Sequence, residues 1–111
     1  MIYKVRITDA AIRDIEKAAD YIDFILMNSE AAERLVDDTE TTIRSLSVAP
    51  KAYPYVSDPV LASWSIRFEK IRNYILFFLV DDEQSTVYVV RFLHERQDWS
   101  RILREETDLE I

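Results

Sequence analysis

The chain has 111 residues, with no cysteine, no glycine, one histidine and three prolines. Without cysteine it forms no disulfide and offers no thiolate to a metal, as is typical of a protein of the reducing cytoplasm. Without glycine it cannot build a glycine-rich loop around a phosphate. A single histidine argues against an all-protein zinc site, so we expect neither a metal nor another cofactor.

Long hydrophobic runs are also missing. The longest run, from Tyr74 to Val80, has the length of a strand, whereas a membrane-spanning helix needs about 20 apolar residues. The first seven residues lack the apolar stretch of a signal peptide. We therefore expect a cytoplasmic protein without membrane contact, folded as one domain over residues 1–111.

The formal net charge is −7, which argues against nonspecific binding to nucleic acid. The charge is unevenly distributed. Residues 1–50 hold six Lys/Arg against ten Asp/Glu, whereas residues 60–104 hold seven against six. The second region is locally basic on an acidic protein, which fits contact with a phosphate backbone or an acidic partner.

The first half of the sequence predicts one strand and two helices. Apolar and polar residues alternate over residues 2–7, and Thr8 or Asp9 then caps a helix that continues to about Leu26. After a break at residues 27–29, with Asn28 or Ser29 as the cap, a second helix follows. So short a connection predicts an antiparallel helical hairpin. The positions predicted to face the core are Ala11, Ile12, Ile15, Ala18, Ala19, Ile22, Ile25, Leu26, Ala32, Leu35, Val36, Thr39, Ile43 and Leu46.

The second half predicts a sheet. Residues 49–62 hold all three prolines and are expected to form a loop. Strands are predicted over residues 64–69, 73–80 and 86–94, and a short helix over residues 97–104. The uninterrupted apolar run of the middle strand predicts a central position with both faces covered. The expected fold is α+β with the order β-α-α-β-β-β: a helical hairpin on a small, mainly antiparallel four-stranded sheet, followed by a C-terminal helical turn.

A cluster of polar side chains at the end of the last strand could contact a phosphate backbone. Metal-free RNA cleavage needs a proton acceptor, a proton donor and cations that stabilise charge on phosphorus. As a nuclease, the chain would use His94 for proton transfer, because imidazole exchanges protons near neutral pH. Arg67 and Arg96 would stabilise charge, and Arg72 would position the substrate. The alternative for Arg67 and Arg72 is pairing across the sheet with Glu69, Asp81 or Asp82.

Arg91 and Trp99 are further candidates for contact with a substrate or target. Strand alternation places Arg91 opposite Val90, Phe92 and His94, so Arg91 and His94 can share one site only if a β-bulge intervenes. Trp99 either anchors the last helical turn or stacks on a base. The remaining aromatic residues of the sheet are expected to be core before they are stacking platforms; they are Tyr74, Phe77, Phe78, Tyr88 and Phe92.

The helical hairpin, then Arg67 ahead of residues 73–78 (NYILFF), then the ending Val89 to Trp99 (VVRFLHERQDW) resemble the RelE/ParE superfamily of type II toxins, also called plasmid stabilisation proteins. The resemblance extends from Tyr3 to about Leu103. It implies a growth-inhibiting bacterial toxin held inactive by a cognate antitoxin encoded beside it. RelE-like members cut mRNA on the ribosome, whereas ParE-like members poison DNA gyrase.

The departures from the RelE pattern favour the ParE-like activity. RelE-like nucleases tend to carry several lysines and arginines along the second strand, where this chain offers Arg67 between Ser65 and Glu69 on one face. They also tend to end with a catalytic tyrosine, where this chain has Trp99. The ending His94 to Asp98 is closer to ParE-like members. A ribosome-dependent mRNA endonuclease, or an inactive relic that only binds antitoxin, remain as alternatives.

The resemblance also implies an antitoxin segment that folds over the helices and the sheet of the toxin, giving a toxin–antitoxin hetero-oligomer. We expect this segment to contact exposed aromatic and apolar residues of the first helix, Tyr21, Phe24 and Met27. We expect a second contact at Tyr53 and Tyr55 in the proline-rich stretch. The alternative is that these side chains complete the core.

Overall fold

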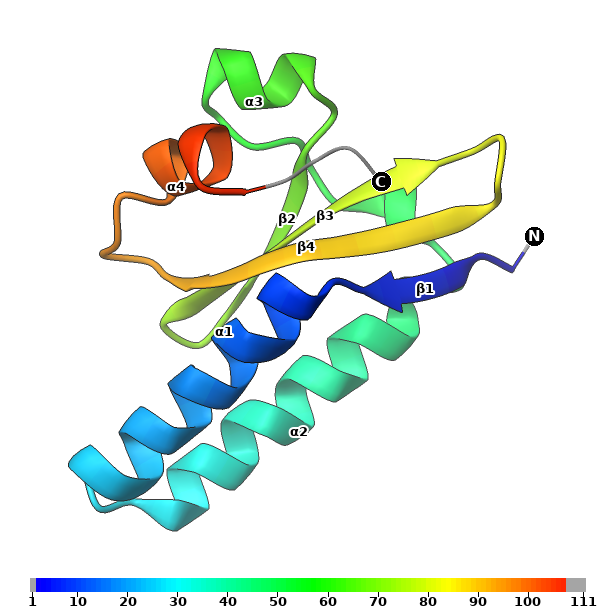
Figure 1. Cartoon of the computed structure of the whole chain (residues 1–111). Coiled ribbons are helices and arrows are strands. Elements are labelled where there is room, and N and C mark those ends of the chain that lie inside the picture. Colours follow the sequence, from blue (N-terminus) through cyan, green and yellow to red (C-terminus); the bar gives the residue numbers. More distant parts are fainter. Residues whose placement is uncertain (1, 108–111) are drawn as a thin grey trace.

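The computed structural model describes residues 2–107 and contains one mixed sheet with helices on both faces (Figure 1). The elements follow in the order β1 (Lys4–Ile7), α1 (Asp9–Asp20), α2 (Ser29–Ser45), α3 (Pro59–Ser63), β2 (Arg67–Ile71), β3 (Tyr74–Asp81), β4 (Thr86–His94) and α4 (Trp99–Glu105). A π-helical turn, Tyr21–Ile25, extends α1, and a 3₁₀ turn, Pro50–Ala52, precedes α3.

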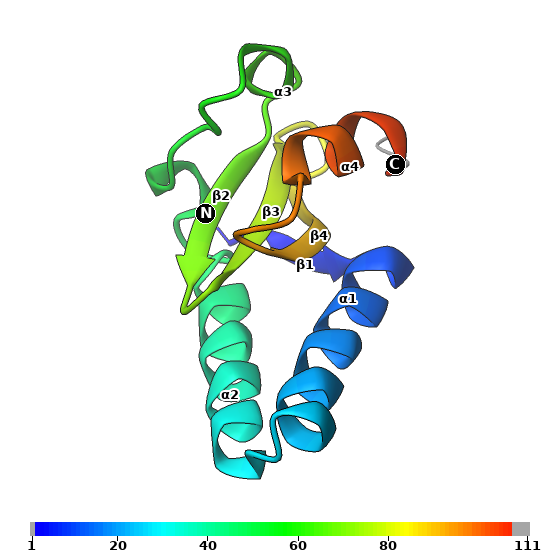
Figure 2. The ribbon, with the colours of Figure 1, turned by 90° about the vertical axis from the view of Figure 1, so that its left-hand side faces the viewer.

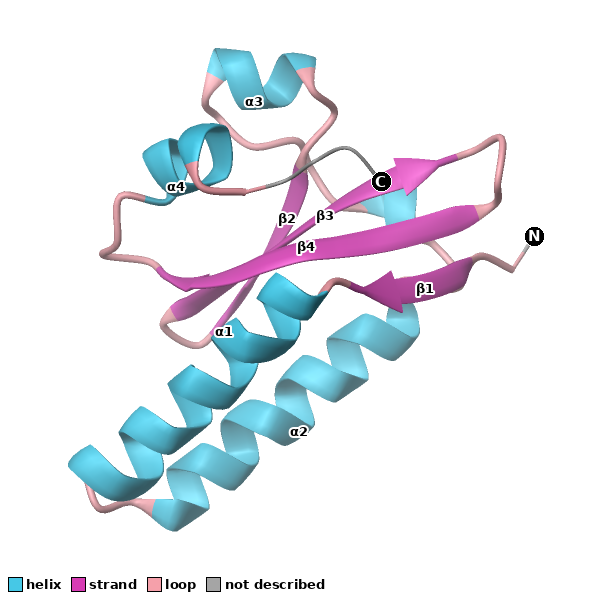
Figure 3. Ribbon diagram, viewed as in Figure 1, coloured by secondary structure: helices cyan, strands magenta, loops and turns pink. Residues whose placement is uncertain are grey.

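The four strands lie in the order β1-β4-β3-β2 (Figure 3). β1 pairs in parallel with β4, and the β4–β3 and β3–β2 pairs are antiparallel. The prediction of a small, mainly antiparallel four-stranded sheet is confirmed. β3 has a neighbour on each side, and Leu76, Phe77 and Phe78 on it are buried, so the prediction of a central strand is confirmed as well.

The predicted helical hairpin is present and begins as the sequence indicates. The Thr8 hydroxyl accepts a hydrogen bond from the Ala11 N–H at 3.2 Å, and the Asn28 side-chain oxygen accepts one from the Ala31 N–H at 3.0 Å. Both caps satisfy backbone donors that a helix N-terminus leaves unpaired. Figure 2 shows α1 and α2 on one side of the sheet and α3 and α4 on the other.

Two apolar clusters cover the two faces of the sheet. The cluster under the hairpin joins Ala11, Ala18, Leu35 and Leu46 to strand residues Ile71, Leu76, Phe78, Val87, Val89 and Phe92. The cluster under α3 and α4 joins Val56, Leu61, Ile66, Ile102 and Leu103 to strand residues Phe77, Val90 and Leu93. Burial on both faces explains why β3 and β4 are almost continuously apolar.

Three predicted core positions of the hairpin are exposed. Ile12, Ile25 and Leu26 meet the helical spacing but face solvent. The prediction was wrong for them because periodicity identifies an apolar side of a helix without saying how far the covering surface extends. The hairpin continues past the edge of the sheet, so Ile25 and Leu26 at its distal end have no strand to pack against (Figure 1). Ile12 is in the first turn of α1, and it is exposed because it lies off the side of the helix on which Ala11 and Ala18 are buried.

The region between the hairpin and the sheet also differs from expectation. Residues 49–62 are not only a loop, since they include the 3₁₀ turn and the start of α3. Asp58 caps α3 by accepting from the Val60 and Leu61 N–H groups, and Pro59 occupies the first helical turn, where a missing N–H costs nothing. The second strand therefore begins at Arg67 rather than Trp64.

Several tight turns use residues other than glycine, which this chain lacks. Within residues 2–107, Met27, Ser65, Arg72 and Ser85 have φ angles of 53°, 66°, 56° and 48°. This left-handed region is unfavourable for a residue with a Cβ atom. Ser65 therefore belongs to the turn before β2 rather than to a strand face shared with Arg67. In the described part of the chain no helix is both long and apolar enough to span a bilayer.

Candidate functional site

Arg67 opens β2, and its guanidinium binds the segment that precedes α3. Nη1 donates to the backbone oxygens of Tyr53 at 2.6 Å and Lys51 at 3.3 Å, and Nη2 donates to the Tyr55 hydroxyl at 3.0 Å. The guanidinium carbon lies 4.1 Å from the centre of the Tyr55 ring, within cation–π range. Arg67 thus holds residues 51–55 against the edge of the sheet. The alternative prediction, an ion pair with a carboxylate of the sheet, is wrong for Arg67.

Arg72 lies in the turn between β2 and β3 and pairs with the hairpin. Its Nε donates to Asp38 Oδ2 at 2.8 Å, and both side chains are about half exposed. Asp38 on α2, rather than a carboxylate on the sheet, is therefore its partner. An exposed pair of this kind contributes about 0–1 kcal/mol, and its main effect is to orient the Arg72 side chain.

Arg91 is the most enclosed cation among the ion pairs of residues 2–107. Its Nε and Nη2 donate to the two carboxylate oxygens of Asp14 at 2.6 and 2.9 Å. The side chains of Arg91 and Asp14 are 15% and 11% exposed. The Phe92 N–H also donates to Asp14 at 3.0 Å. Sequence reasoning missed Asp14, although a carboxylate between Ala11 and Ala18 on the buried stripe of α1 was the available signal.

A β-bulge lies beside Arg91. Phe77 pairs with Arg91 and Phe78 pairs with Val89, so Val90 is the extra residue of β4. Beyond it the alternation reverses: Val90 belongs to the cluster under α4, and Phe92 belongs to the cluster under the hairpin. The expectation that Val90 and Phe92 share a face was wrong, because the bulge shifts the phase. Arg91 pairs with Phe77 and His94 pairs with Tyr74, so alternation still places these two residues on opposite faces of the sheet. Both nevertheless line one hollow, because the Arg91 guanidinium reaches Asp14 on α1.

We call this hollow the cationic hollow. It has a volume of about 170 Å³ and is lined by Asp14, Lys17, Ala18, Tyr21, Tyr74, Arg91, Phe92, Leu93, His94 and Gln97. It lies where α1 crosses the end of β4. Burial raises the pKa of Tyr74, whose ring stacks on Phe92 with the centroids 5.1 Å apart. The hydroxyl of Tyr74 therefore stays protonated and remains a hydrogen-bond donor.

His94 ends β4 and is held by the turn that follows it. Its Nδ1 accepts a hydrogen bond from the Arg96 N–H at 3.1 Å, and its backbone N–H donates to Gln97 Oε1 at 2.8 Å. The ring packs edge-on against Tyr74 with the centroids 5.1 Å apart. Because Nδ1 acts as an acceptor, the neutral ring carries its proton on Nε2.

The residues predicted for a nuclease do not all converge, because Arg67 lies apart from His94. Arg67 pairs with Phe78, which pairs with Val89, whereas His94 pairs with Tyr74 at the other end of the sheet. Five residues of β4 separate these two levels, a distance of roughly 15 Å at 3.3 Å per residue. Arg96 is close to His94 in sequence and exposed. The structure thus places Arg96 near His94 and Arg72 at a hollow that His94 also lines, and it places Arg67 far from His94.

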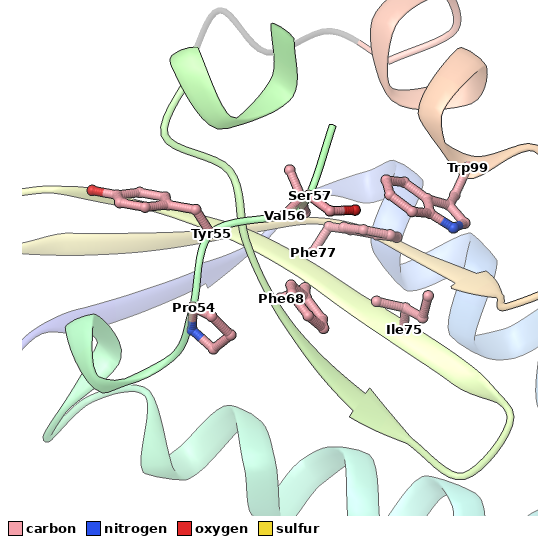
Figure 4. Close-up of a pocket in the computed structure, with 8 residues that line it drawn as sticks. All are labelled: Pro54, Tyr55, Val56, Ser57, Phe68, Ile75, Phe77 and Trp99. Atoms are coloured by element: carbon pink, nitrogen blue, oxygen red, sulfur yellow. The ribbon is translucent and has the colours of Figure 1, made fainter. Parts of the chain in front are cut away.

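The face of the sheet under α4 carries a second, apolar hollow of about 270 Å³. Figure 4 shows Phe68, Ile75 and Phe77 between the 54–57 segment and Trp99. Trp99, the first residue of α4, packs against Phe77 with the ring centroids 5.4 Å apart. The lining residues include no charged side chain; they are Pro54, Tyr55, Val56, Ser57, Phe68, Ile75, Phe77 and Trp99.

Lys70 is a second cation of β2, which sequence reasoning missed because it ended the strand at Glu69. Alternation along β2 places Lys70 on the same side as Phe68, beside the apolar hollow. Its Nζ lies 2.7 Å from Glu95 Oε2, and this contact lowers the pKa of Glu95 below the ordinary value. Both cations on β2 are therefore engaged by other groups of the chain, Arg67 by carbonyls and Lys70 by a carboxylate.

The five predicted antitoxin contacts fall in two different environments. Tyr21, Phe24 and Met27 are exposed at the distal end of the hairpin, and Phe24 and Met27 reach 70% and 86% exposure. Ile25 and Leu26 belong to the same exposed patch and were missed, because helical spacing assigned them to the core. Tyr53 packs edge-on against Phe78 at 5.6 Å and its hydroxyl meets Ser45 Oγ at 2.9 Å, whereas Tyr55 is half exposed under Arg67.

Comparison with solved structures identifies the fold. The chain is similar to a protein in the chromosomal ParDE toxin–antitoxin system of P. aeruginosa, with 18% identity over 84% of this chain and 96% of that one, and a TM-score of 0.66. It is also similar to a chain of the Mycobacterium tuberculosis RelBE2 toxin–antitoxin complex, with 25% identity over 85% and 99% of the two chains and a TM-score of 0.57. A mutant of E. coli RelE in the free state has 18% identity over 94% and 97%, with a TM-score of 0.59.

These likenesses show a RelE/ParE-like fold, as the sequence predicted. Comparison with curated proteins found no significant match. Residues 5–99 match the family model described as the ParE toxin of the type II toxin–antitoxin system parDE. Because the match covers most of the sequence, the chain belongs to the ParE toxin family.

Proposed function

We propose that this ParE-family toxin arrests growth by binding a protein target, DNA gyrase, rather than by cutting RNA. The observation that supports this most is the position of the cations. Arg67, the one predicted charge-stabilising residue on β2, is bound to the 51–55 segment, and its level on the sheet lies roughly 15 Å along the strands from that of His94. A nuclease would need both groups at one phosphate.

The apolar hollow supports the same proposal. Where RelE-like enzymes are expected to hold lysines, arginines and a catalytic tyrosine, this chain presents Phe68, Phe77 and Trp99. A surface of this kind suits apolar contacts with a protein. Its lining residues offer no charge to a phosphate, and Lys70 beside it is paired with Glu95. Because the proposed target, DNA gyrase, is a cytoplasmic enzyme, we propose that the toxin is cytoplasmic as well.

We further propose that a cognate antitoxin neutralises the toxin in a hetero-oligomer. The distal patch of the hairpin, Tyr21, Phe24, Ile25, Leu26 and Met27, is the largest group of neighbouring exposed apolar residues in the sequence of residues 2–107. Such patches mark interaction surfaces on soluble domains. Tyr55, which is half exposed, offers a second contact together with Tyr53, whose ring packs on Phe78.

Induction of this chain alone in a bacterial host tests the activity. We expect filamentation and DNA damage with intact mRNA, and retained toxicity in a His94→Ala variant. Rapid loss of translation with mRNA cut on ribosomes, abolished by His94→Ala, would instead establish a nuclease in which His94 transfers protons. No arrest by a folded, soluble chain would identify an inactive relic that only binds antitoxin.

A further inference from the structure

A second hollow adjoins the cationic hollow. It has a volume of about 330 Å³ and shares Tyr21, Tyr74 and His94 with the first. Its other lining residues are mainly apolar and come from the inner side of the hairpin and the β2–β3 turn; they are Ile22, Leu26, Asn28, Ala31, Leu35, Arg72 and Asn73. The two hollows form one groove with a cationic end at Lys17 and Arg91 and an apolar end at Leu26 and Leu35.

The charge of this groove is opposite to that of the whole chain. Its lining includes Lys17, Arg72 and Arg91 against a single carboxylate, Asp14, whereas the chain has a net charge of −7. Asp14 is already engaged by Arg91, and Arg72 is engaged by Asp38 on α2, which leaves Lys17. Lys17 forms no ion pair with any residue from 2 to 107. The cationic end therefore has one ammonium group that no carboxylate of the described residues pairs with directly.

The cationic hollow is also lined by uncharged hydrogen-bond donors, on His94 and Gln97. Because His94 Nδ1 accepts from the Arg96 N–H, the ring presents Nε2 as its donor. The Gln97 side-chain oxygen accepts from the His94 N–H, which leaves the amide NH₂ of Gln97 as a further donor. An ammonium, an imidazole N–H and an amide NH₂ at one small hollow match a carboxylate, which only accepts hydrogen bonds when ionised.

The other side of the hairpin has the opposite character. A hollow between α1 and α2 is bordered by Asp20, Asp23, Glu33 and Asp37, with no cation among its lining residues. An acidic segment would be repelled there and attracted to the groove at Lys17. The two sides of the hairpin thus differ in the sign of the charge that they accept.

We propose that the groove binds an acidic segment of the antitoxin, with an Asp or Glu carboxylate in the cationic hollow and an apolar side chain of the same segment beside Leu26. This inference rests on the proposed neutralisation by an antitoxin. The volume of about 170 Å³ suits one carboxylate side chain, and the apolar end favours a peptide over a free anion.

The test is the affinity of the full toxin chain for the antitoxin encoded beside its gene, purified and titrated at low and at high salt. Lys17→Glu should weaken binding at least tenfold at low salt and less at high salt. Lys4→Glu is the matched control, because it makes the same charge change on β1, far along the sheet from His94. It should change the affinity less than threefold.

A second pair of variants tests the apolar end. Leu26→Asp should weaken binding at least tenfold, whereas Val48→Asp, which changes another exposed apolar residue near the base of the hairpin, should not. Acidic residues of the antitoxin changed one at a time to Lys should include one that restores binding to the Lys17→Glu toxin. Unfolding curves for each variant exclude loss of fold as the cause.

The outcomes separate the two proposals. If the unchanged toxin binds antitoxin and Lys17→Glu behaves like Lys4→Glu, the groove is not the contact and this inference is overturned, while the proposed neutralisation stands. If the unchanged toxin does not bind the antitoxin at all, the proposed neutralisation fails, and the inference fails with it.

Discussion

The two ends of the helical hairpin have similar apolar sequences and opposite surroundings. Near the sheet, Ala11, Leu35 and Leu46 are buried against strand residues, whereas at the distal end Phe24, Leu26 and Met27 face solvent. Burial follows the extent of the sheet and not the apolar content of the helix. The proximal end therefore stabilises the fold, and the distal end is left for a partner.

Truncating one leucine at each end is the most direct way to break this comparison. Leu35 is 1% exposed and Leu26 is 55% exposed. Leu35→Ala leaves a cavity in the cluster under the hairpin and should lower the free energy of unfolding by about 2–5 kcal/mol. Leu26→Ala should change it by about 0.5 kcal/mol or less. Urea unfolding followed by circular dichroism measures both, and equal losses would contradict the assignment of the distal end to binding.

Removing Asp14 tests the polar contact that joins the proximal end to β4. Asp14→Ala leaves Arg91 largely enclosed without its carboxylate and the Phe92 N–H without its acceptor. The expected loss of unfolding free energy is about 3 kcal/mol. Asp20→Ala, nearer the distal end and exposed, is the control and should lie within about 0.5 kcal/mol of the unchanged chain. A similar, small effect of both changes would show that the Asp14–Arg91 pair contributes little.

The smallest expected effect has the opposite sign. Met27 has a φ of 53° and its side chain is 86% exposed. Met27→Gly removes the strain of a left-handed non-glycine residue but gives the unfolded chain more freedom, so the net gain should be about 0.5 kcal/mol. The same variant should weaken antitoxin binding. We expect the urea midpoint of this variant to rise and its affinity for the antitoxin to fall. That result would support the division of the hairpin into a proximal end that stabilises the fold and a distal end that binds a partner.

Prediction from sequence succeeded where the signal is local. The cap residues Thr8 and Asn28 and the apolar run of β3 each depend on neighbouring residues, and the structure confirms them. Prediction failed where contacts with distant segments determine the local structure. Ser65 was assigned to a strand, yet the capping of α3 by Asp58 extends helical structure almost to that point. The phase of β4 changed because Val90 is an extra residue opposite β3, which no alternation pattern reveals.

The sequence by itself determined the order of the elements, the helical hairpin, the central strand and the resemblance to the RelE/ParE toxins, because these follow from periodicity, caps and motif order. Only the tertiary structure decided what the charged residues do. Arg67 meets backbone carbonyls, Arg72 meets Asp38 and Arg91 meets Asp14, and each partner is more than ten residues away in sequence. Long side chains reach whatever the fold brings near them, so their roles depend on packing.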